Sequence, residues 1–300
     1  MRQRKSAELA LLVTVLIWSL NFVAVKTGVT YIPPLAFSVT RFALGATVTL
    51  IVALRLEGRP HFRRADLPLL VLAALIGISI NQAAFVGALR QTTASNTALL
   101  IGTIAVWTSV IAVITRQERL ALHHWTGVGI GLLGVALIVL GGNRADGSAP
   151  TFLGEVLALT TAASWAIYSV IIRPLMARYT ALSLSSFMMV VGTVALVPFA
   201  LPELASTDWK SVPTQAWLGL LYAALFSVSL TNILYFTAIG RVGASRAALY
   251  TYLEPFLGVM FATLLLGERV TPFQLLGGVV VVAAILVARP RRWTIAEPGI

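Results

Sequence analysis

Long apolar stretches follow one another along the chain, and only short polar segments separate them. A helix needs about 20 mostly apolar residues to cross the hydrocarbon core of a bilayer, and each stretch comes close to that length. The pattern therefore predicts an all-α membrane protein with ten transmembrane helices. The expected helices are Leu9–Val25, Leu35–Leu54, Leu67–Leu89, Thr97–Thr115, Trp125–Leu140, Phe152–Ile172, Ala181–Leu201, Ala216–Ala238, Ala247–Leu266 and Phe273–Ala288.

The last third of the chain repeats its middle third 150 residues later, without a gap. Matched pairs are Ala73 with Ala223, Ser95 with Ser245, Glu118 with Glu268 and, after a short slip, Trp18 with Trp165. Each copy carries five apolar stretches, and an odd number of crossings turns the second copy upside down. Inverted copies with a site between them are a recurrent plan of secondary transporters. We expect two inverted five-helix repeats, at 1–142 and 152–290, around a central cavity in one integrated transport domain.

The composition is typical of a membrane protein and argues against disulfides, metal sites and nucleotide-binding sites. The chain is 58% hydrophobic and 11% charged, whereas soluble domains are about 25% charged. It has no cysteine, so disulfides and thiolate metal sites cannot form. No phosphate loop with Gly-Lys-Ser/Thr occurs, and the three histidines stand in polar segments without acids to complete a metal site. We expect no cofactor, no metal and no enzymatic activity.

The net charge of +11 is distributed unevenly between the two predicted sides of the membrane. With a cytoplasmic N-terminus, sixteen of the 22 Lys and Arg residues fall in cytoplasmic segments. The positive-inside rule then places both termini in the cytoplasm of a multi-pass protein, which we assign to a bacterial inner membrane. Because the basic residues are scattered over short loops, we expect no nucleic-acid partner.

Polar and aromatic residues interrupt the apolar stretches at matched depths of the two copies. The pairs are Trp18 with Trp165, Asn21 with Tyr168, Asn81 with Thr231, Gln82 with Asn232, and Phe85 with Tyr235. The bilayer core offers no water to an amide, so these side chains should face protein or a wet cavity. Interhelical hydrogen bonding would explain any one of them. Their recurrence on matched faces favours a substrate-binding cavity shared by both halves.

The fourth and ninth predicted helices form another inverted pair. Leu100 and Trp107 share one face of the fourth helix at helical spacing, and Tyr250 belongs to the equivalent stripe of the ninth. We include these three residues among the candidate substrate contacts.

Two charged residues lie at membrane depth. Glu254 is the only acid expected so deep, where a charge costs about 2.5–3.5 kcal/mol. It has either a structural role, paired with Arg246 or a tyrosine, or a role in coupling or substrate contact. Pro255 is expected to kink the ninth helix. Arg41, within the second helix, either binds a substrate carboxylate or extends its charge toward the membrane surface.

Glycines mark close packing in the fifth and tenth predicted helices. They are Gly127, Gly131 and Gly134 in the fifth, with Gly277 and Gly278 in the tenth. The spacing of Gly127 and Gly131 is the small-x-x-x-small pattern of packed membrane helices. We expect these two helices to hold the halves together or to form a dimer face, and the protein to be a monomer or weak dimer.

These residues resemble the EamA-type carriers of the drug/metabolite transporter superfamily. The resemblance covers nearly the whole chain and is greatest to bacterial amino-acid and metabolite exporters of the aromatic amino acid exporter type. It rests on Trp18-Ser19-x-Asn21-Phe22, Arg41-Phe42, Glu118-Arg119, Leu253-Glu254-Pro255 and Leu266-Gly267-Glu268-Arg269. It implies ten helices, cytoplasmic termini, a central cavity lined mainly by helices 1, 3, 4, 6, 8 and 9, and efflux by alternating access. Many relatives carry proline where this chain has Ala105, opposite Pro255, so we expect unequal bending of the two halves.

The residues at mid-depth narrow the choice of substrate. Phosphorylated solutes need a clamp of buried Lys or Arg, which the third, fourth, sixth, eighth and ninth helices do not offer. Organic cations prefer buried acids and aromatic faces, and Glu254 alone supplies the acid. A zwitterion with an apolar side chain suits amides and hydroxyls beside aromatic walls. We therefore expect broad amino-acid export, including aromatic and other apolar side chains, with multidrug or other small-metabolite efflux as the alternative.

Two other classes of membrane protein, a lipid enzyme and a channel, are compared with the transporter hypothesis. A polytopic lipid enzyme would need a cluster of acids and bases at headgroup level, which the chain does not show. A channel would pass currents far faster than the turnover of a carrier. The partners expected are a small-molecule substrate and the lipid bilayer.

Overall fold

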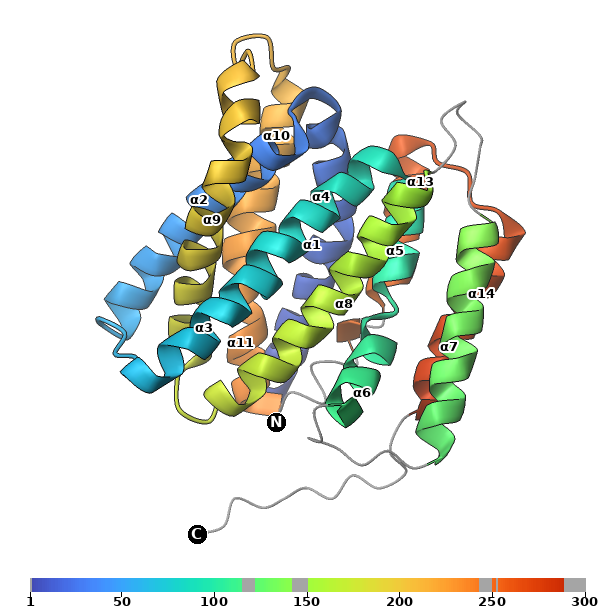
Figure 1. Cartoon of the computed structure of the whole chain (residues 1–300), viewed down its shortest axis with the longest axis horizontal. Coiled ribbons are helices and arrows are strands. Elements are labelled where there is room, and N and C mark those ends of the chain that lie inside the picture. The colour runs from blue at the N-terminus through green and yellow to red at the C-terminus, as the bar shows by residue number, and fades with distance from the viewer. Residues whose placement is uncertain (1, 115–121, 142–150, 243–249, 252, 289–300) are drawn as a thin grey trace.

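The computed structural model describes residues 2–114, 122–141, 151–242, 250–251 and 253–288, and every regular element in this part of the chain is helical (Figure 1). Glu118, Arg119, Ser245, Arg246 and most of the segment between the predicted repeats lie outside the described residues. Six helices are long and apolar enough to cross a membrane, and four shorter apolar helices accompany them. The predicted all-α membrane architecture is thus confirmed in its class, while the count of ten spans stays a prediction.

Two of the six long spans change helix type along their length. The first-half helices are α1 Arg2–Tyr31, α2 Pro34–Leu56, η1 Arg64–Asp66, α3 Leu67–Ala74, η2 Leu75–Ile80, α4 Asn81–Gln91, α5 Ala94–Ile101, α6 Ile104–Ile114 and α7 Leu122–Leu140. The later helices are α8 Phe152–Leu175, α9 Ala181–Ser206, α10 Thr214–Tyr222, η3 Ala223–Leu230, α11 Thr231–Val242, α13 Glu254–Leu266 and α14 Pro272–Ala288. Element η1 is a short 3-10 turn, and η2 and η3 are π-helical.

The two π-helical segments occupy corresponding places of the repeat. In η2 the Asn81 N–H donates to Ile76 O, and in η3 the Thr231 N–H donates to Phe226 O. These donors are 150 residues apart, as are the acceptors, so the widened turn recurs at one position of each copy. A π turn within an α-helix is rare and is often found at functional sites. In each copy the π-helical segment ends directly before the predicted polar pair, which is Asn81 and Gln82 in the first copy and Thr231 and Asn232 in the second.

Contacts across the halves recur with the same symmetry. Ser79 of η2 donates its hydroxyl to Gly192 O of α9 at 2.8 Å, and Ser229 of η3 donates to Gly45 O of α2 at 3.0 Å. Glycine is needed at both acceptor positions, because an added Cβ would lie 2.4 Å from Ile78 or 2.5 Å from Val228. Each π segment is thus seated against the second helix of the other half, which supports the predicted repeat.

Carboxylates join α2 and α9 at both of their ends. Glu203 accepts from the Leu35 and Ala36 N–H groups at the start of α2, at 2.6 and 3.0 Å. At the opposite end, Glu57 accepts from the hydroxyls of Thr180 and Ser183 at the start of α9. The first backbone N–H groups of a helix lack partners within it and carry partial positive charge, so acidic side chains stabilise them.

The predicted fourth helix is broken, although it has no proline. Gly102 and Thr103 separate α5 from α6, and the Thr103 hydroxyl donates to Leu100 O at 2.6 Å. In the ninth predicted helix, Leu253 is a turn residue, and α13 begins at Glu254 with Pro255 in its first turn. A Cβ added at Gly102 would lie 2.8 Å from Pro255 Cγ, so the two interruptions pack against each other. The first-half helix is therefore interrupted without a proline, and unequal bending of the two halves stays a prediction.

Helices α7 and α14 form a closely packed pair beside the other helices (Figure 1). A Cβ added at Gly134 would lie 2.9 Å from Gly277 O, and one added at Gly277 would lie 2.7 Å from Gly134 O. The glycines thus let the two backbones touch, as their spacing predicts. Because α7 and α14 come from different predicted repeats, the pair joins the halves of the chain.

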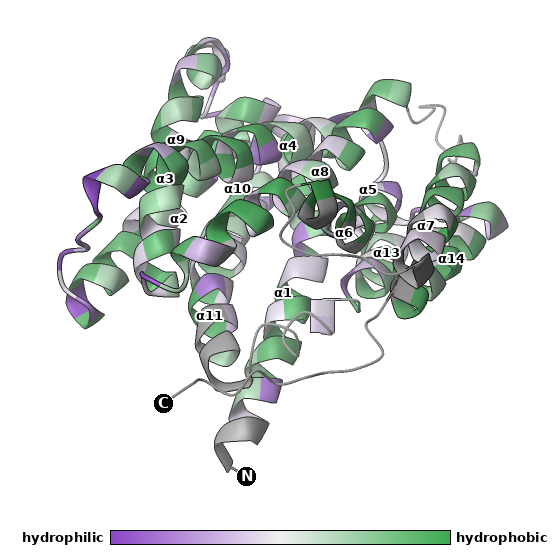
Figure 2. Cartoon of the chain, turned by 60° about the horizontal axis from the view of Figure 1, so that its bottom comes forward, coloured by the Kyte–Doolittle hydropathy of each residue, from purple (hydrophilic) through white to green (hydrophobic). Residues whose placement is uncertain are grey.

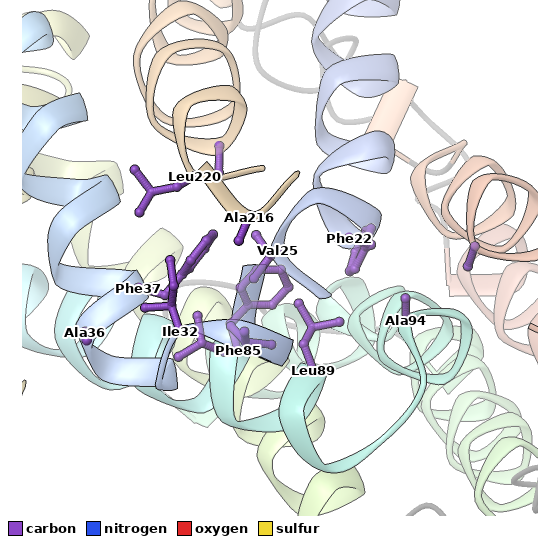
Figure 3. Packing of buried hydrophobic residues seen from close by; sticks show 14 of the residues in the cluster. Phe22, Val25, Ile32, Ala36, Phe37, Phe85, Leu89, Ala94, Ala216 and Leu220 are labelled. Carbon is purple, nitrogen blue, oxygen red and sulfur yellow. The ribbon is translucent and has the colours of Figure 1, made fainter. Parts of the chain in front are cut away.

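The outer surface of the helices is strongly apolar, and polar residues collect near helix ends (Figure 2). Large side chains such as Leu140, Phe152 and Phe199 are more than two-thirds exposed. Isolated exposed apolar residues are ordinary, but an apolar surface on this scale marks contact with a membrane. Inside, Phe22, Phe37 and Phe85 belong to a buried cluster between α1, α2 and α4 (Figure 3).

Candidate functional site

Helix α1 packs against helices of both halves, including α4, α10, α11 and α13. Trp18 makes the central contact, because its indole Nε1 donates to Thr231 Oγ1 at 2.9 Å and to Ser227 O at 3.2 Å. The Trp18 and Tyr235 rings lie 5.2 Å apart at a tilt of 53°. Two predicted site residues of different halves, Trp18 and Tyr235, are therefore in contact.

Glu254 lies beside this contact. Ser19 donates its hydroxyl to the backbone oxygen of Glu254 at 3.2 Å, so α1 holds the start of α13. The Glu254 side chain is within electrostatic range of Tyr235, and among the described residues none donates a hydrogen bond to its carboxylate. Trp18, Thr231, Tyr235 and Glu254 are called the Trp18 cluster below. Arg246, one of the partners considered for Glu254, lies outside the described residues.

Tyr250 adjoins the Trp18 cluster. It packs, with Tyr235, against a small apolar core made of Ala7, Leu11 and Ala238. Tyr250 thus shares the surroundings of Tyr235.

A second group of polar residues links α2, α4 and α8. Arg41 donates from Nη2 to Gln82 Oε1, and Gln82 donates from Nε2 to Asn81 Oδ1 at 2.8 Å. Asn81 in turn donates from Nδ2 to Thr161 O at 2.9 Å and to Ser164 Oγ at 3.1 Å. These side chains, called the Arg41 network below, satisfy one another in sequence, as buried polar groups must in a membrane.

Arg41 is only 2% exposed, and its guanidinium lies among aromatic rings. Its Cζ lies 5.2 Å from the Phe42 ring centre, 5.5 Å from Phe85 and 5.7 Å from Phe37. Cations over aromatic faces are stabilised by the ring quadrupole. Arg41 has no carboxylate partner in the described part of the chain, and its Nε has no hydrogen-bond partner there. The expectation that Arg41 extends to the membrane surface is therefore wrong for this structure, because the side chain is enclosed.

Aromatic contacts extend from Arg41 toward α1. The Phe85 and Phe22 rings meet edge to face with centres 5.8 Å apart. A Cβ added at Gly258 in α13 would lie 3.2 Å from the Phe22 ring. Phe85 thus belongs to a continuous apolar path from Arg41, past Phe22, to the helix that begins with Glu254.

On α8, Trp165 and Tyr168 contact each other, with ring centres 5.4 Å apart. Tyr168 is buried, and a Cβ added at Gly77 in η2 would lie 2.3 Å from its ring. Both residues also pack in the core between α2, α3, α8 and α9. They therefore adjoin the Arg41 network through η2 and Ser164.

Two of the predicted amide side chains differ in whether the amide oxygen accepts a hydrogen bond. Asn232 donates from Nδ2 to Val228 O, and its Oδ1 accepts from Ser185 of α9 at 3.1 Å. Asn21 is buried, and its Oδ1 has no partner among the described residues. Asn21 lies one helical turn from Trp18 and next to Phe22, so it offers an unused acceptor between the two groups described above.

Leu100 and Trp107 are not joined to either group. Leu100 is fully buried in a core with Leu99, Ile138 and Val281. Trp107 lies on α6, beyond the break at Gly102, and its Nε1 has no partner among the described residues.

Several residues that complete these groups carry little signal in the sequence. Ser19, Thr161, Ser164 and Ser185 supply hydroxyl or carbonyl groups, yet small hydroxyl residues are common in membrane helices. Ser19 and Ser164 immediately adjoin Trp18 and Trp165, and this adjacency is the one clue that could have singled them out.

Known proteins resemble this chain over nearly its whole length. A probable amino-acid metabolite efflux pump of Escherichia coli is 30% identical over 294 residues, covering 95% of this chain and 94% of that protein. A probable terminal-alkyne amino-acid exporter of Streptantibioticus cattleyicolor is 26% identical and covers 94% of this chain and 93% of its own. One solved structure, at 18% identity and a TM-score of 0.65, covers 95% of this chain and 97% of that one, and shows the same fold.

The helices, the apolar surface and these relatives define a multi-pass membrane transporter, not an enzyme. The profile of the EamA-like transporter family matches twice, at residues 5–140 and 152–289. The chain belongs to the EamA-like transporter family, so the resemblance expected from its motifs is confirmed.

Proposed function

We propose that this protein is a secondary transporter that exports amino acids across the bacterial inner membrane by alternating access. Two relatives named for amino-acid or amino-acid metabolite efflux support the substrate class. The observation that carries the proposal is the Trp18 cluster, in which donors, acceptors, rings and one acid from both halves meet around α1. The contacts of a solute bound between the halves would change whenever the halves move relative to each other, as alternating access requires.

Opposite charges of the site suit the two ends of a zwitterion. The Arg41 guanidinium, which has no carboxylate partner in the described chain, would attract the substrate carboxylate. Glu254, whose carboxylate accepts no hydrogen bond from described residues, would face the ammonium group. The amide acceptor of Asn21 and the rings of Trp18, Phe85, Trp165 and Tyr235 would contact the remainder of the substrate, including an apolar side chain.

The halves are assigned to 1–142 and 152–290, with both termini in the cytoplasm. The first repeat contributes α1, α2 and α4 to the site, and the second contributes α8, α11 and α13. Leu100, Trp107 and Tyr250 remain proposed contacts through the fourth and ninth helices, although only Tyr250 adjoins the Trp18 cluster in this structure.

Counterflow in proteoliposomes tests the proposal. Vesicles loaded with unlabelled phenylalanine or leucine should accumulate external labelled phenylalanine, and empty vesicles with reconstituted protein should not. N-acetyl phenylalanine and phenylalanine amide, which each lack one charge, should compete at least about tenfold more weakly, since each loses one charged contact. Equal competition by all three compounds would contradict zwitterion recognition.

Efflux of organic cations is the alternative, and it is favoured by Glu254 lying within electrostatic range of Tyr235, whose ring contacts Trp18. An acid with aromatic faces recognises lipophilic cations. Accumulation of labelled tetraphenylphosphonium against loaded unlabelled compound, without counterflow of amino acids, would select this function.

A further inference from the structure

A buried carboxylate joins the α13–α14 connection to the start of α5. Glu268 is 7% exposed and accepts the Ala94 N–H at 2.8 Å, the Ser95 N–H at 2.8 Å and the Ser95 hydroxyl at 2.7 Å. Both backbone donors belong to the first turn of α5, where N–H groups have no partner within the helix. One side chain of the second half thereby satisfies the end of a first-half helix.

The backbone before Glu268 is shaped to present this side chain. Gly267 ends α13 in the left-handed conformation, with φ of +68°, a position that glycine adopts without strain. The N–H of Glu268 returns to Ala262 O at 3.4 Å, so the turn folds back on its own helix.

Further hydrogen bonds gather around the first turn of α5. Asn96 donates to Glu155 Oε1 of α8 at 3.3 Å, and Gln274 of α14 donates to Asn96 Oδ1 at 3.4 Å. Lys26 of α1 donates to Leu89 O at 2.7 Å and to Thr92 O at 2.6 Å, just before α5 begins. The start of α5 is thus held to α1, α8, α13 and α14 at one end of the bundle.

Below this end, α5 and α13 face each other directly. A Cβ added at Gly258 would lie 2.8 Å from Ala98 Cβ, and the Gly102 break of α5 meets Pro255 of α13. Both helices are therefore short, interrupted segments that touch along their length. Separation of their Glu268 end would open a path toward Ala98, and further toward the Trp18 cluster.

We propose that Glu268 is a gating residue, which closes the outer end of the transport path by binding the first turn of α5. This proposal rests on the transport function proposed above and on the predicted topology, in which the α4–α5 and α13–α14 connections lie outside. Substrate release to the outside requires the three bonds to Glu268 to break. Inward-facing states retain them.

A suitable control acid is Glu203, which caps α2 from α9 at the same end of the bundle with two backbone hydrogen bonds. Its helices are also joined at their opposite ends through Glu57, so they move together. Glu203→Gln therefore makes the same chemical change at a contact that does not separate α5 from α13.

The test uses Ala98→Cys as a single thiol, since the chain has no cysteine. A membrane-impermeant maleimide added outside right-side-out vesicles should label this thiol about tenfold faster when Glu268→Gln is also present, because a charge-assisted cap becomes a neutral one. Ser95→Ala removes only the hydroxyl donor and should accelerate labelling less, in the same direction. Glu203→Gln should leave the rate unchanged.

Thermal unfolding of each variant in detergent provides the folding control. Equal labelling rates in the parent, Glu268→Gln and Ser95→Ala, with all three folded, would overturn the gating role. Equal acceleration by Glu203→Gln would also overturn it, because the effect would then be general loosening. The labelling needs no substrate, so the labelling rates could still be interpreted if amino-acid counterflow were not observed.

Discussion

Trp18 of α1 donates its indole N–H to Thr231 Oγ1 at 2.9 Å, directly after the π-helical segment of the second half. The corresponding first-half residue, Asn81, donates to Ser164 Oγ of α8 at 3.1 Å, directly after the other π segment. Each widened turn therefore delivers a polar group to the first helix of the opposite half. The two contacts differ in chemistry but join equivalent pairs of elements, α1 with α11 and α8 with α4.

We expect Trp18→Phe to reduce efflux while the protein still folds. The substitution keeps an aromatic ring beside Tyr235 and removes the donor to Thr231, a bond worth about 0.6 kcal/mol on average in membranes. Counterflow of labelled phenylalanine should fall severalfold, while the midpoint of thermal unfolding changes by only a few degrees. Thr231→Val removes this acceptor and leaves the bond from Trp18 to Ser227 O, so it should reduce counterflow less, and the double variant should be no worse than Trp18→Phe.

Gln82 should be sensitive to the loss of its acceptor oxygen. Gln82→Leu leaves the buried Arg41 guanidinium without that partner, which costs about 1–3 kcal/mol. Gln82→Glu keeps an acceptor and pairs it with the Arg41 charge, so it should restore stability but abolish carboxylate transport. Denaturation in detergent and counterflow measure the two effects. If both variants transport normally, the Arg41 network is only a packing device.

Glu254→Gln separates coupling from structure. The variant keeps the size of the side chain and removes its charge. If the acid carries a coupling proton, the variant should still exchange substrate for substrate and should lose the response to a pH gradient, because exchange needs no proton release. Flux in vesicles with and without the gradient is the measurement. A structural role predicts instead a lower unfolding temperature, and unchanged flux, pH response and stability would remove Glu254 from the mechanism.

Gly134→Ala should destabilise the α7–α14 pair by about 1–3 kcal/mol through overpacking. The added methyl would lie 2.7 Å from Val281 Cγ2 and 2.9 Å from Gly277 O. Gly129→Ala in the same helix meets nothing within 4 Å and serves as the matched control. Thermal unfolding in detergent distinguishes the two, and an equal response of both variants would show that contact with α14 does not decide the effect.

The topology can be checked with single thiols at exposed loop residues. Lys210→Cys, between α9 and α10, should react with an impermeant maleimide from outside right-side-out vesicles. Arg59→Cys, after α2, should react only after the membrane is opened, because basic loops are retained in the cytoplasm. The reverse pattern would invert the assignment of both termini and of the Glu268 gate.

Apolar stretches and the repeat predicted the helical fold because both depend on side-chain type alone. The break at Gly102 and Thr103 could not be predicted, since it arises where α5 meets Pro255 of α13. The enclosure of Arg41 likewise depends on three phenylalanines that come from two helices.

The sequence grouped Trp18, Asn81, Gln82 and Tyr235 as one set of polar and aromatic residues at membrane depth, and the structure brings Trp18 to Tyr235 and Gln82 to Asn81. It gave no sign that Leu100 faces an apolar core, since a leucine on a helix looks the same in a core or a cavity. It also gave no partner for Glu268, whose backbone N–H donors lie 174 and 173 positions away.

The matched π segments bear on the ancestry of the chain. A π turn amounts to one residue inserted into an α-helix, and the insertion rotates all later side chains by about 100° relative to the earlier ones. Asn81 and Thr231 both follow such an insertion at the same register. The most economical history is that the extra residue entered a single five-helix ancestor and was copied when that gene doubled. Removing one residue from either segment would thus undo a step older than the duplication, and would turn one half of the site away from the other.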